Sequence, residues 1–340
     1  MNEYSLAKVQ LFINKSSSTI GRSFVLYITM QLLGNSILFF GKGQHFFTQK
    51  YMTQQAEYFE VHPDSIYAYL ADNISHPLNE YFILYLSFGI VGILVLVFFL
   101  YYLWISWKRE KTVWHVMLFC AILMSVFSYC LHYPVVLFLS ILSLSQIRTN
   151  NKITLKNNSL SRFVIFIICV FVGIQTIQSI NFEYKWKNVF AKQLKSPRST
   201  FVVEEYEKIE RLWNGKPFFY YDYASVLRNN FEYEKSISKL KFYKKYVVSY
   251  NSELLMAQNY YDEGKHDKAI CHFNQARWMC PNRFLPLQGI MRSYKAIGDK
   301  KRAIEIANEI KTKQIKINSY TVTLIKKEAD ALLNDVSYER

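Results

Sequence analysis

The sequence offers few of the patterns that carry metal or disulfide chemistry. Of its five cysteines, Cys120, Cys130 and Cys169 lie in apolar runs, where packing is their simplest role. Cys271 and Cys280 fall on one predicted helix about 13 Å apart, which is too far for a disulfide bond. No residue spacing resembles a zinc site, so no metal is expected.

The N-terminus lacks the basic, apolar and small-residue pattern of a signal peptide. Residues 23–41 carry no charge but contain several polar side chains. This mixture favours an amphipathic helix on the outer face of a membrane, and a membrane span is the alternative. With either arrangement, residues 42–80 are expected on the extracytoplasmic side of the membrane.

Charge is missing from three long stretches, which predicts membrane helices. Residues 81–107 are long enough to cross a bilayer with tilt. Residues 112–147 exceed one crossing, and Pro134 divides them into two predicted spans. Residues 163–180 give the last predicted span.

Basic loops orient these spans. Lys and Arg cluster in residues 108–111 and 148–162, whereas the turn at 131–134 has neither. The positive-inside rule therefore places both basic loops in the cytoplasm of a bacterium and the C-terminal half in the periplasm. Were residues 112–147 a single crossing, the C-terminal half would be cytoplasmic.

The sequence thus predicts an all-α chain with three domains: an extracytoplasmic segment (1–80), a membrane domain of about four helices (81–181) and a periplasmic domain (182–340). Residues 183–340 hold 29 Lys and Arg against 19 Asp and Glu, so +10 of the net +15 lies there. Such a surface suits anionic lipid or acidic glycan, and nucleic acid is not expected. A merely solvated surface is the alternative.

A 34-residue period in the C-terminal half predicts a helical repeat. Tyr260, Gly264 and Ala269 recur as Tyr294, Gly298 and Ala303. The fuller pattern is typical of a tetratricopeptide repeat (TPR), whose small residues let two helices approach closely: Ala257, Tyr260, Gly264, Ala269, Phe273, Ala276 and Pro281. A degenerate unit is expected before it, with Ala224 and Ser236 at small positions, and a closing helix at 317–334. The repeats either bind a protein partner or only position the membrane part.

Residues 15–80 hold the remaining motifs. Gly21-Arg22 opens an apolar segment, Gly41-Lys42-Gly43 follows it, and an aromatic and amide-rich stretch includes residues 55–59. The segment ends in His76-Pro77-Leu78-Asn79-Glu80 at the entry to the first span. In order and spacing this set resembles the C-terminal conserved region of the O-antigen ligase and polymerase family, in the Bacteroides-type variant with a C-terminal TPR domain.

The resemblance implies a glycosyltransferase of the bacterial inner membrane that works at the outer face, in lipopolysaccharide or polysaccharide biosynthesis. It would move a glycan from an undecaprenyl diphosphate carrier to a glycan or lipid acceptor, with no cofactor. Arg22 would stabilise charge on the departing diphosphate, and His76 would take the acceptor proton. The expected substrate contacts are Lys42, Gln55, Tyr58, Asn79 and Glu80.

Each of these residues also has a plainer interpretation. Arg22 can be an interfacial anchor, His76 an interfacial residue, and Asn79 and Glu80 a helix cap. The chain also departs from the family. Leu78 stands where many relatives have a second histidine, and the family has more spans. A truncated or split member, or one that works with a separate partner, is therefore expected. The rival hypothesis is a non-catalytic, membrane-anchored TPR scaffold that recruits an envelope protein.

Overall fold

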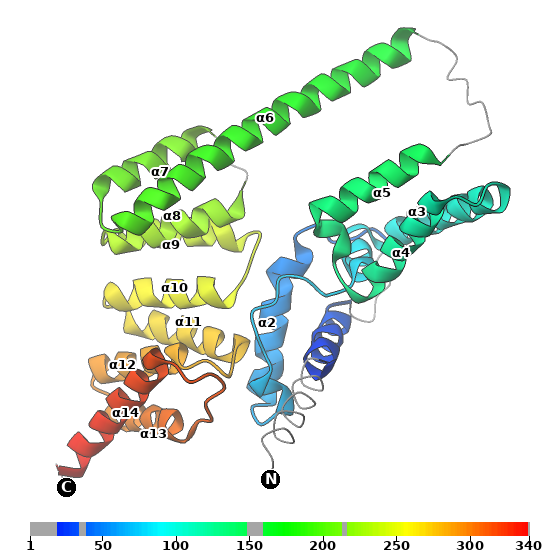
Figure 1. Cartoon of the computed structure of the whole chain (residues 1–340). Helices are drawn as coiled ribbons and strands as arrows, with labels where there is room; N and C mark the ends of the chain where they lie inside the picture. Colours follow the sequence, from blue (N-terminus) through cyan, green and yellow to red (C-terminus); the bar gives the residue numbers. More distant parts are fainter. Residues whose placement is uncertain (1–18, 34–38, 148–158, 213–215, 339–340) are drawn as a thin grey trace, which may run out of the picture. The chain divides into compact units, whose positions relative to one another are not determined.

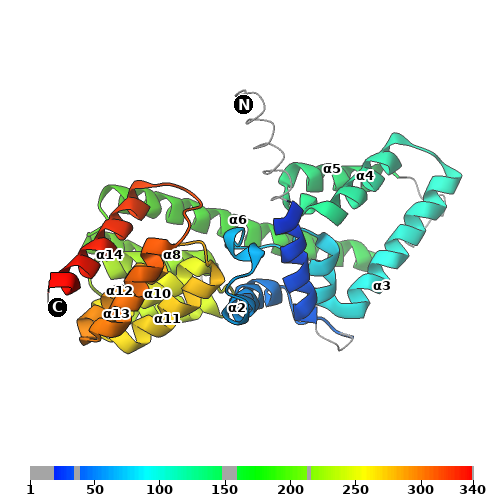
Figure 2. The same ribbon diagram turned by 90° about the horizontal axis from the view of Figure 1, so that it is seen from below.

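A computed structural model describes residues 19–33, 39–147, 159–212 and 216–338 (Figures 1 and 2). Within these ranges the chain is built of α-helices and short 3-10 helices, with no strand. The prediction of an all-α chain is confirmed for the described residues.

In the part of the chain that the structure describes, two helices are long and apolar enough to cross a membrane. They are α3 (Glu80–Arg109) and residues Phe166–Lys195 of α6 (Ser159–Lys195). Only 22% and 6% of their apolar windows are buried by protein, so neither behaves as the core helix of a globular domain. The two helices between them are shorter: α4 (Val113–Phe127) and α5 (Pro134–Gln146). At 1.5 Å per residue they are about 20 Å long, short of the roughly 30 Å of a bilayer core.

The break between α4 and α5 lies where the sequence predicted it. A 3-10 turn, η2 (Cys130–His132), follows α4, and Pro134 is the first residue of α5. A proline fits this position because its missing N–H has no partner at a helix start.

The helix α3 is interrupted at Gly89, which has φ 66° and ψ −150°. The first half of α3 therefore ends near Ser87, and its free carbonyls bind another segment of the chain. The N–H of Lys42 donates to the carbonyl of Leu86 at 2.8 Å, and that of Gly43 donates to Ser87 at 3.3 Å. A Cβ on Gly41 would lie 2.0 Å from the Ser87 carbonyl carbon, so this approach requires glycine.

Contacts divide the chain into two compact units. The first contains residues Met1–Tyr101, Phe119–Phe138 and Lys244–Arg340, and the second contains Tyr102–Leu118 and Leu139–Tyr243. These boundaries do not follow the predicted ones at 80 and 182, because residues 46–75 pack on the C-terminal helices rather than forming a segment of their own.

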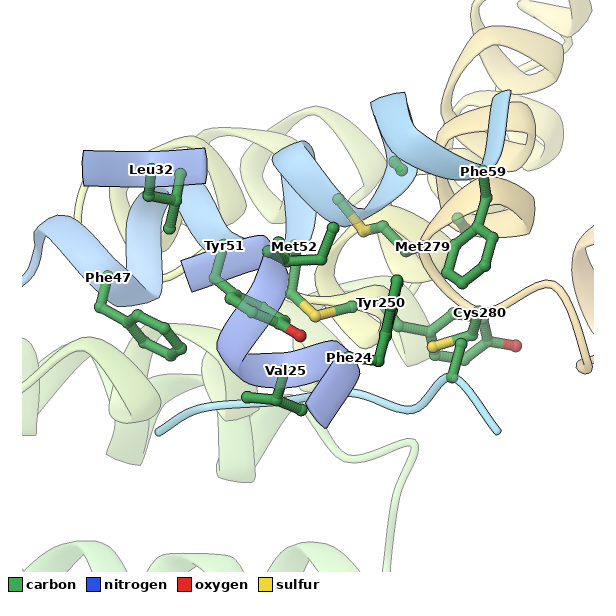
Figure 3. Close-up of a cluster of buried hydrophobic side chains, with 14 of the residues drawn as sticks. Phe24, Val25, Leu32, Phe47, Tyr51, Met52, Phe59, Tyr250, Met279 and Cys280 are labelled. Carbon is green, nitrogen blue, oxygen red and sulfur yellow. The ribbon is translucent and has the colours of Figure 1, made fainter. Parts of the chain in front are cut away.

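The core of the first unit joins residues 19–33, the helix α2 (Phe46–Val61) and the start of the C-terminal helices (Figure 3). Tyr51 and Phe59 of α2 are fully buried there beside Met279 and Cys280. Figures 1 and 2 both show α2 alongside the end of α11 (His266–Met279).

The helix over residues 19–33 buries one face in protein, while Ile20, Tyr27 and Met30 are exposed, and its expected place on a membrane stays a prediction. Phe24, Val25, Ile28 and Leu32 share one face and are buried in the core of the first unit. This apolar face thus packs on protein rather than on lipid. Residues 34–38, part of the same predicted segment, lie outside the described residues.

The C-terminal helices repeat as antiparallel hairpins: α10 (Tyr250–Asp262) with α11, and α12 (Leu285–Ile297) with α13 (Lys300–Thr312), closed by α14 (Tyr320–Tyr338). The helix α11 begins at His266 and α13 at Lys300, 34 residues later. The predicted small positions Ala257 and Ala269 are fully buried with Phe273 between the helices. The 34-residue helical repeat is therefore present.

The glycines of the repeat have a backbone reason. Gly264 and Gly298 have φ values of 77° and 89°, the left-handed conformation that glycine adopts without strain. Each lies at the turn between the two helices of a hairpin.

The second unit contains all of α6, α7 (Thr200–Leu212) and α8 (Pro217–Asn229), and α9 (Tyr233–Lys244) except its last residue. Ala224 and Ser236, the small positions of the expected degenerate repeat, are fully buried. The Ser236 hydroxyl donates to the Ala224 carbonyl at 2.7 Å, which joins α8 to α9 as a hairpin.

Candidate functional site

The turn that leads into α3 has an unusual backbone. Pro77 is buried, and Leu78 after it has φ 58°, a conformation that costs a leucine of order 1–3 kcal/mol. The Leu78 side chain packs against the core of the first unit, which holds this conformation in place. The turn fixes the direction in which His76 is presented.

Asn79 ends the turn and caps α3. Its side-chain oxygen accepts hydrogen bonds from the N–H groups of Tyr81 at 2.9 Å and Phe82 at 3.2 Å. Its amide nitrogen donates to the carbonyl of Val126 near the end of α4 at 2.9 Å. Asn79 therefore has a structural role in joining α3 to α4.

A second bond supports the same junction. The Tyr81 hydroxyl donates to the carbonyl of Ile122 at 2.7 Å. Because the end of α4 is tied to the start of α3 in this way, the residues after α4 lie next to His76.

His76 forms a cluster with two such residues and with Glu80. Its ring stacks on Tyr129 at 5.0 Å between centroids, and the His132 ring lies at the same distance. The Nδ1 atom of His132 is 3.1 Å from Oε1 of Glu80. We call His76, Glu80, Tyr129 and His132 the boundary cluster, because it lies where α3 begins.

The surroundings favour the neutral form of His76. Partial burial and the nearby His132 lower the pKa of His76, and Glu80 opposes them with a smaller effect. A neutral imidazole at pH 7 can accept a proton or a hydrogen bond from a hydroxyl group. Glu80 is suited to orient His132 through their hydrogen bond, while 48% of the His132 side chain remains exposed.

Lys42 is anchored to the opposite end of the same half of α3. Its backbone binds Leu86 and its ammonium lies 4.6 Å from the centre of the Phe46 ring. From Glu80 to Leu86 the helix rises about 9 Å, so Lys42 stands near the boundary cluster but outside it. Its exposed ammonium is available to an anion.

Gln55 lies in the core, with 1% of its surface exposed. Its amide nitrogen donates to the carbonyl of Met279 at 2.6 Å and to that of Asp72 at 3.1 Å. This arrangement joins α2 to the end of α11, and it leaves Gln55 no open surface for the expected sugar contact.

Tyr58 is half-buried in an aromatic group. Its ring lies 5.2 Å from Phe24 and stacks on His62 at 4.8 Å, and its hydroxyl is 3.3 Å from Ser65 Oγ. Arg22 is exposed on the helix that carries Phe24. Among the described residues, no hydrogen bond, ion pair or ring contact joins Arg22 directly to the boundary cluster.

No sequence pattern singled out His132 and Tyr129. The turn at 131–134 was considered only for its lack of Lys and Arg, although the predicted topology placed it on the same side as His76. In the described ranges no group of three or more His, Cys, Asp or Glu side chains is arranged to hold a metal ion.

Comparison with known proteins gives no family to set beside this site. No family model matches the chain, and no curated protein matches it. Over the residues that the structure describes, the chain is all-helical and has two helices long and apolar enough to span a membrane.

Proposed function

We propose that this chain is a membrane glycosyltransferase similar to the O-antigen ligase and polymerase family. It would transfer a glycan from an undecaprenyl diphosphate carrier to a glycan or lipid acceptor. The observation that supports this best is the boundary cluster, in which His76 stands beside His132 and His132 is hydrogen-bonded to Glu80.

In this mechanism neutral His76 takes the proton of the attacking hydroxyl as its oxygen bonds to the donor sugar. The bond from that sugar to the diphosphate breaks, and the diphosphate leaves with the electron pair. Arg22 and Lys42 are the cations assigned to that charge, Arg22 as a planar fork and Lys42 as a point charge. His132 stands in for the second histidine that many relatives have at the position of Leu78.

The site would lie at the periplasmic face of the bacterial inner membrane. The contact between His76 and His132 places the turn between α4 and α5 next to the start of α3. This supports a turn on the periplasmic side, because four crossings require α4 to lead the chain back to the side from which α3 started. The two short helices α4 and α5 would then each cross the membrane once. Residues 182–340 would be periplasmic. Labelling of cysteines introduced at 110 and 265 by an impermeant reagent tests this, since only the second should react.

The catalytic assignment is tested with His76→Ala and Arg22→Lys, each measured for transfer from a lipid diphosphate donor in membranes and for its amount in those membranes. Transfer should fall to background in both variants while the protein level stays normal, because lysine keeps the charge of Arg22 but loses its planar fork. His45→Ala, an exposed histidine on another part of the first unit, is the matched control. Normal transfer by the His76 and Arg22 variants would refute both roles.

A membrane-anchored scaffold with TPR-like repeats is the second candidate. It is favoured by exposed apolar side chains before and within α14: Ile317 is 70% and Tyr320 79% exposed. If the unchanged chain transfers no glycan but retains an envelope protein that Ile317→Asp releases, the scaffold is the better description.

A further inference from the structure

A cleft lies on the repeat side of the first unit. One wall is the loop after α2, including the 3-10 turn η1 (Ile66–Tyr69), and the other is formed where α11 and α13 end. Its volume is about 610 Å³, within the range of small-molecule sites. We call it the Trp278 cleft.

Internal bonds fix its walls. Asn282, after α11, donates from its amide to the carbonyl of Tyr69 at 3.1 Å, which holds the loop against the repeat. The guanidinium of Arg277 donates to both carboxylate oxygens of Glu309, at 2.9 and 2.8 Å, which joins α11 to α13. A binding surface held in this way loses little freedom when a ligand binds.

The charges lining the cleft balance. Its ionisable side chains are two acids and two bases: Asp64, Arg277, Glu309 and Lys313. Arg277 and Glu309 neutralise each other, and burial lowers the pKa of Lys313. The lining therefore carries no net charge, although the Lys316 ammonium lies 5.8 Å from the centre of the Tyr69 ring.

The remaining lining is aromatic and amide in character. Tyr69 is 40% exposed in the cleft, whereas Trp278 is half-buried and has the Arg277 guanidinium 4.6 Å from its ring centre. The Asp64 carboxylate and the Gln314 amide also line it, and both are exposed and make no hydrogen bond with the described residues. Aromatic rings pack against the C–H faces of sugar rings, and carboxylate and amide groups bind adjacent hydroxyls.

We propose that the Trp278 cleft binds an uncharged stretch of oligosaccharide, which is the acceptor glycan held apart from the reacting end. The role as acceptor site rests on the proposed function, whereas the binding itself does not. The boundary cluster and the Trp278 cleft would then divide the work, with chemistry at the start of α3 and retention of the growing glycan on the repeats.

The test uses the full chain in a detergent without a sugar head group, applied to an array of neutral and acidic bacterial glycans. At least one neutral glycan should bind. The double variant Asp64→Asn, Gln314→Ala should bind it about tenfold more weakly, since two hydrogen-bonding groups are lost. Asp267→Asn, an exposed acid in the first turn of α11, should change the affinity less than twofold.

Binding of no glycan, binding of acidic glycans alone, or equal binding by the double variant would overturn the proposal. His76→Ala should keep its array binding even where transfer is lost. Array binding without transfer by the unchanged chain would reject the glycosyltransferase and leave the cleft, whereas transfer without array binding would reject the cleft and leave the enzyme.

Discussion

Two regions of the first unit were expected to contact substrate, and they are built differently. The seam between α2 and α11 is apolar and closed, with Tyr51, Gln55 and Phe59 at most 1% exposed. The boundary cluster is polar, half-open and assembled from two segments about fifty residues apart in sequence. The aromatic and amide-rich stretch of α2 thus mainly stabilises the fold. The polar side chains that a substrate can reach lie beside the start of α3.

The largest effect is expected at the seam. Phe59→Ala should lower the free energy of unfolding by about 3–5 kcal/mol, because it opens a cavity beside Phe24 in a fully buried core. Denaturant titration of the full chain in detergent measures it. Phe40→Ala, at a 74% exposed position, should change it by less than about 0.5 kcal/mol. Equal stability of the two variants would mean that the seam is not a core.

Gln55→Ala separates a structural glutamine from a sugar-binding one. Its loss leaves the carbonyls of Met279 and Asp72 without their donor, so unfolding should be easier by about 1–3 kcal/mol. If Gln55 instead held a sugar, glycan transfer would fall while stability stayed unchanged. Measuring both quantities on the same preparation decides between them.

His132→Gln sharpens the description of the boundary cluster. His132 lowers the pKa of His76, so its removal should raise that pKa toward the usual value of about 6.5. Since a lower pKa keeps His76 neutral to lower pH, the acid limb of transfer should move to higher pH in this variant. NMR titration of labelled histidines measures the same shift without activity.

Glu80→Gln is the counterpart, because Glu80 raises the pKa of His76. It should move the titration to lower pH. Shifts of the same sign in both variants would contradict the opposite effects of His132 and Glu80, and no shift in either would show that neither side chain influences His76.

The smallest effect is expected for the ion pair at the rim of the seam. Asp72 and Arg283 lie 3.0 Å apart but are about half exposed. A double-mutant cycle with Asp72→Asn and Arg283→Gln should give a coupling below about 1 kcal/mol, weaker at high salt. A larger coupling would mean that the ion pair, and not apolar burial alone, contributes substantially to the stability of the seam.

Much of the fold could be predicted because it depends on local patterns. The charge-free stretches predict the apolar helices, and Pro134 predicts the break between α4 and α5. The 34-residue spacing of small residues predicts the helical hairpins. Site prediction was less complete. His76 and Glu80, which share one sequence motif, also lie in one cluster. The Gln55 amide is instead hydrogen-bonded inside the core, and no sequence pattern distinguishes such a buried amide from one that binds a sugar.

The sequence by itself determined the helical class, the apolar runs and the repeat, since each follows from residue spacing along one element. Only the tertiary structure decided that α2 packs on the repeats, that Lys42 binds the broken end of α3 and that His132 stands beside His76. These are contacts between segments separated by tens to hundreds of residues. They depend on burial and hydrogen bonding across the fold, which no local period records.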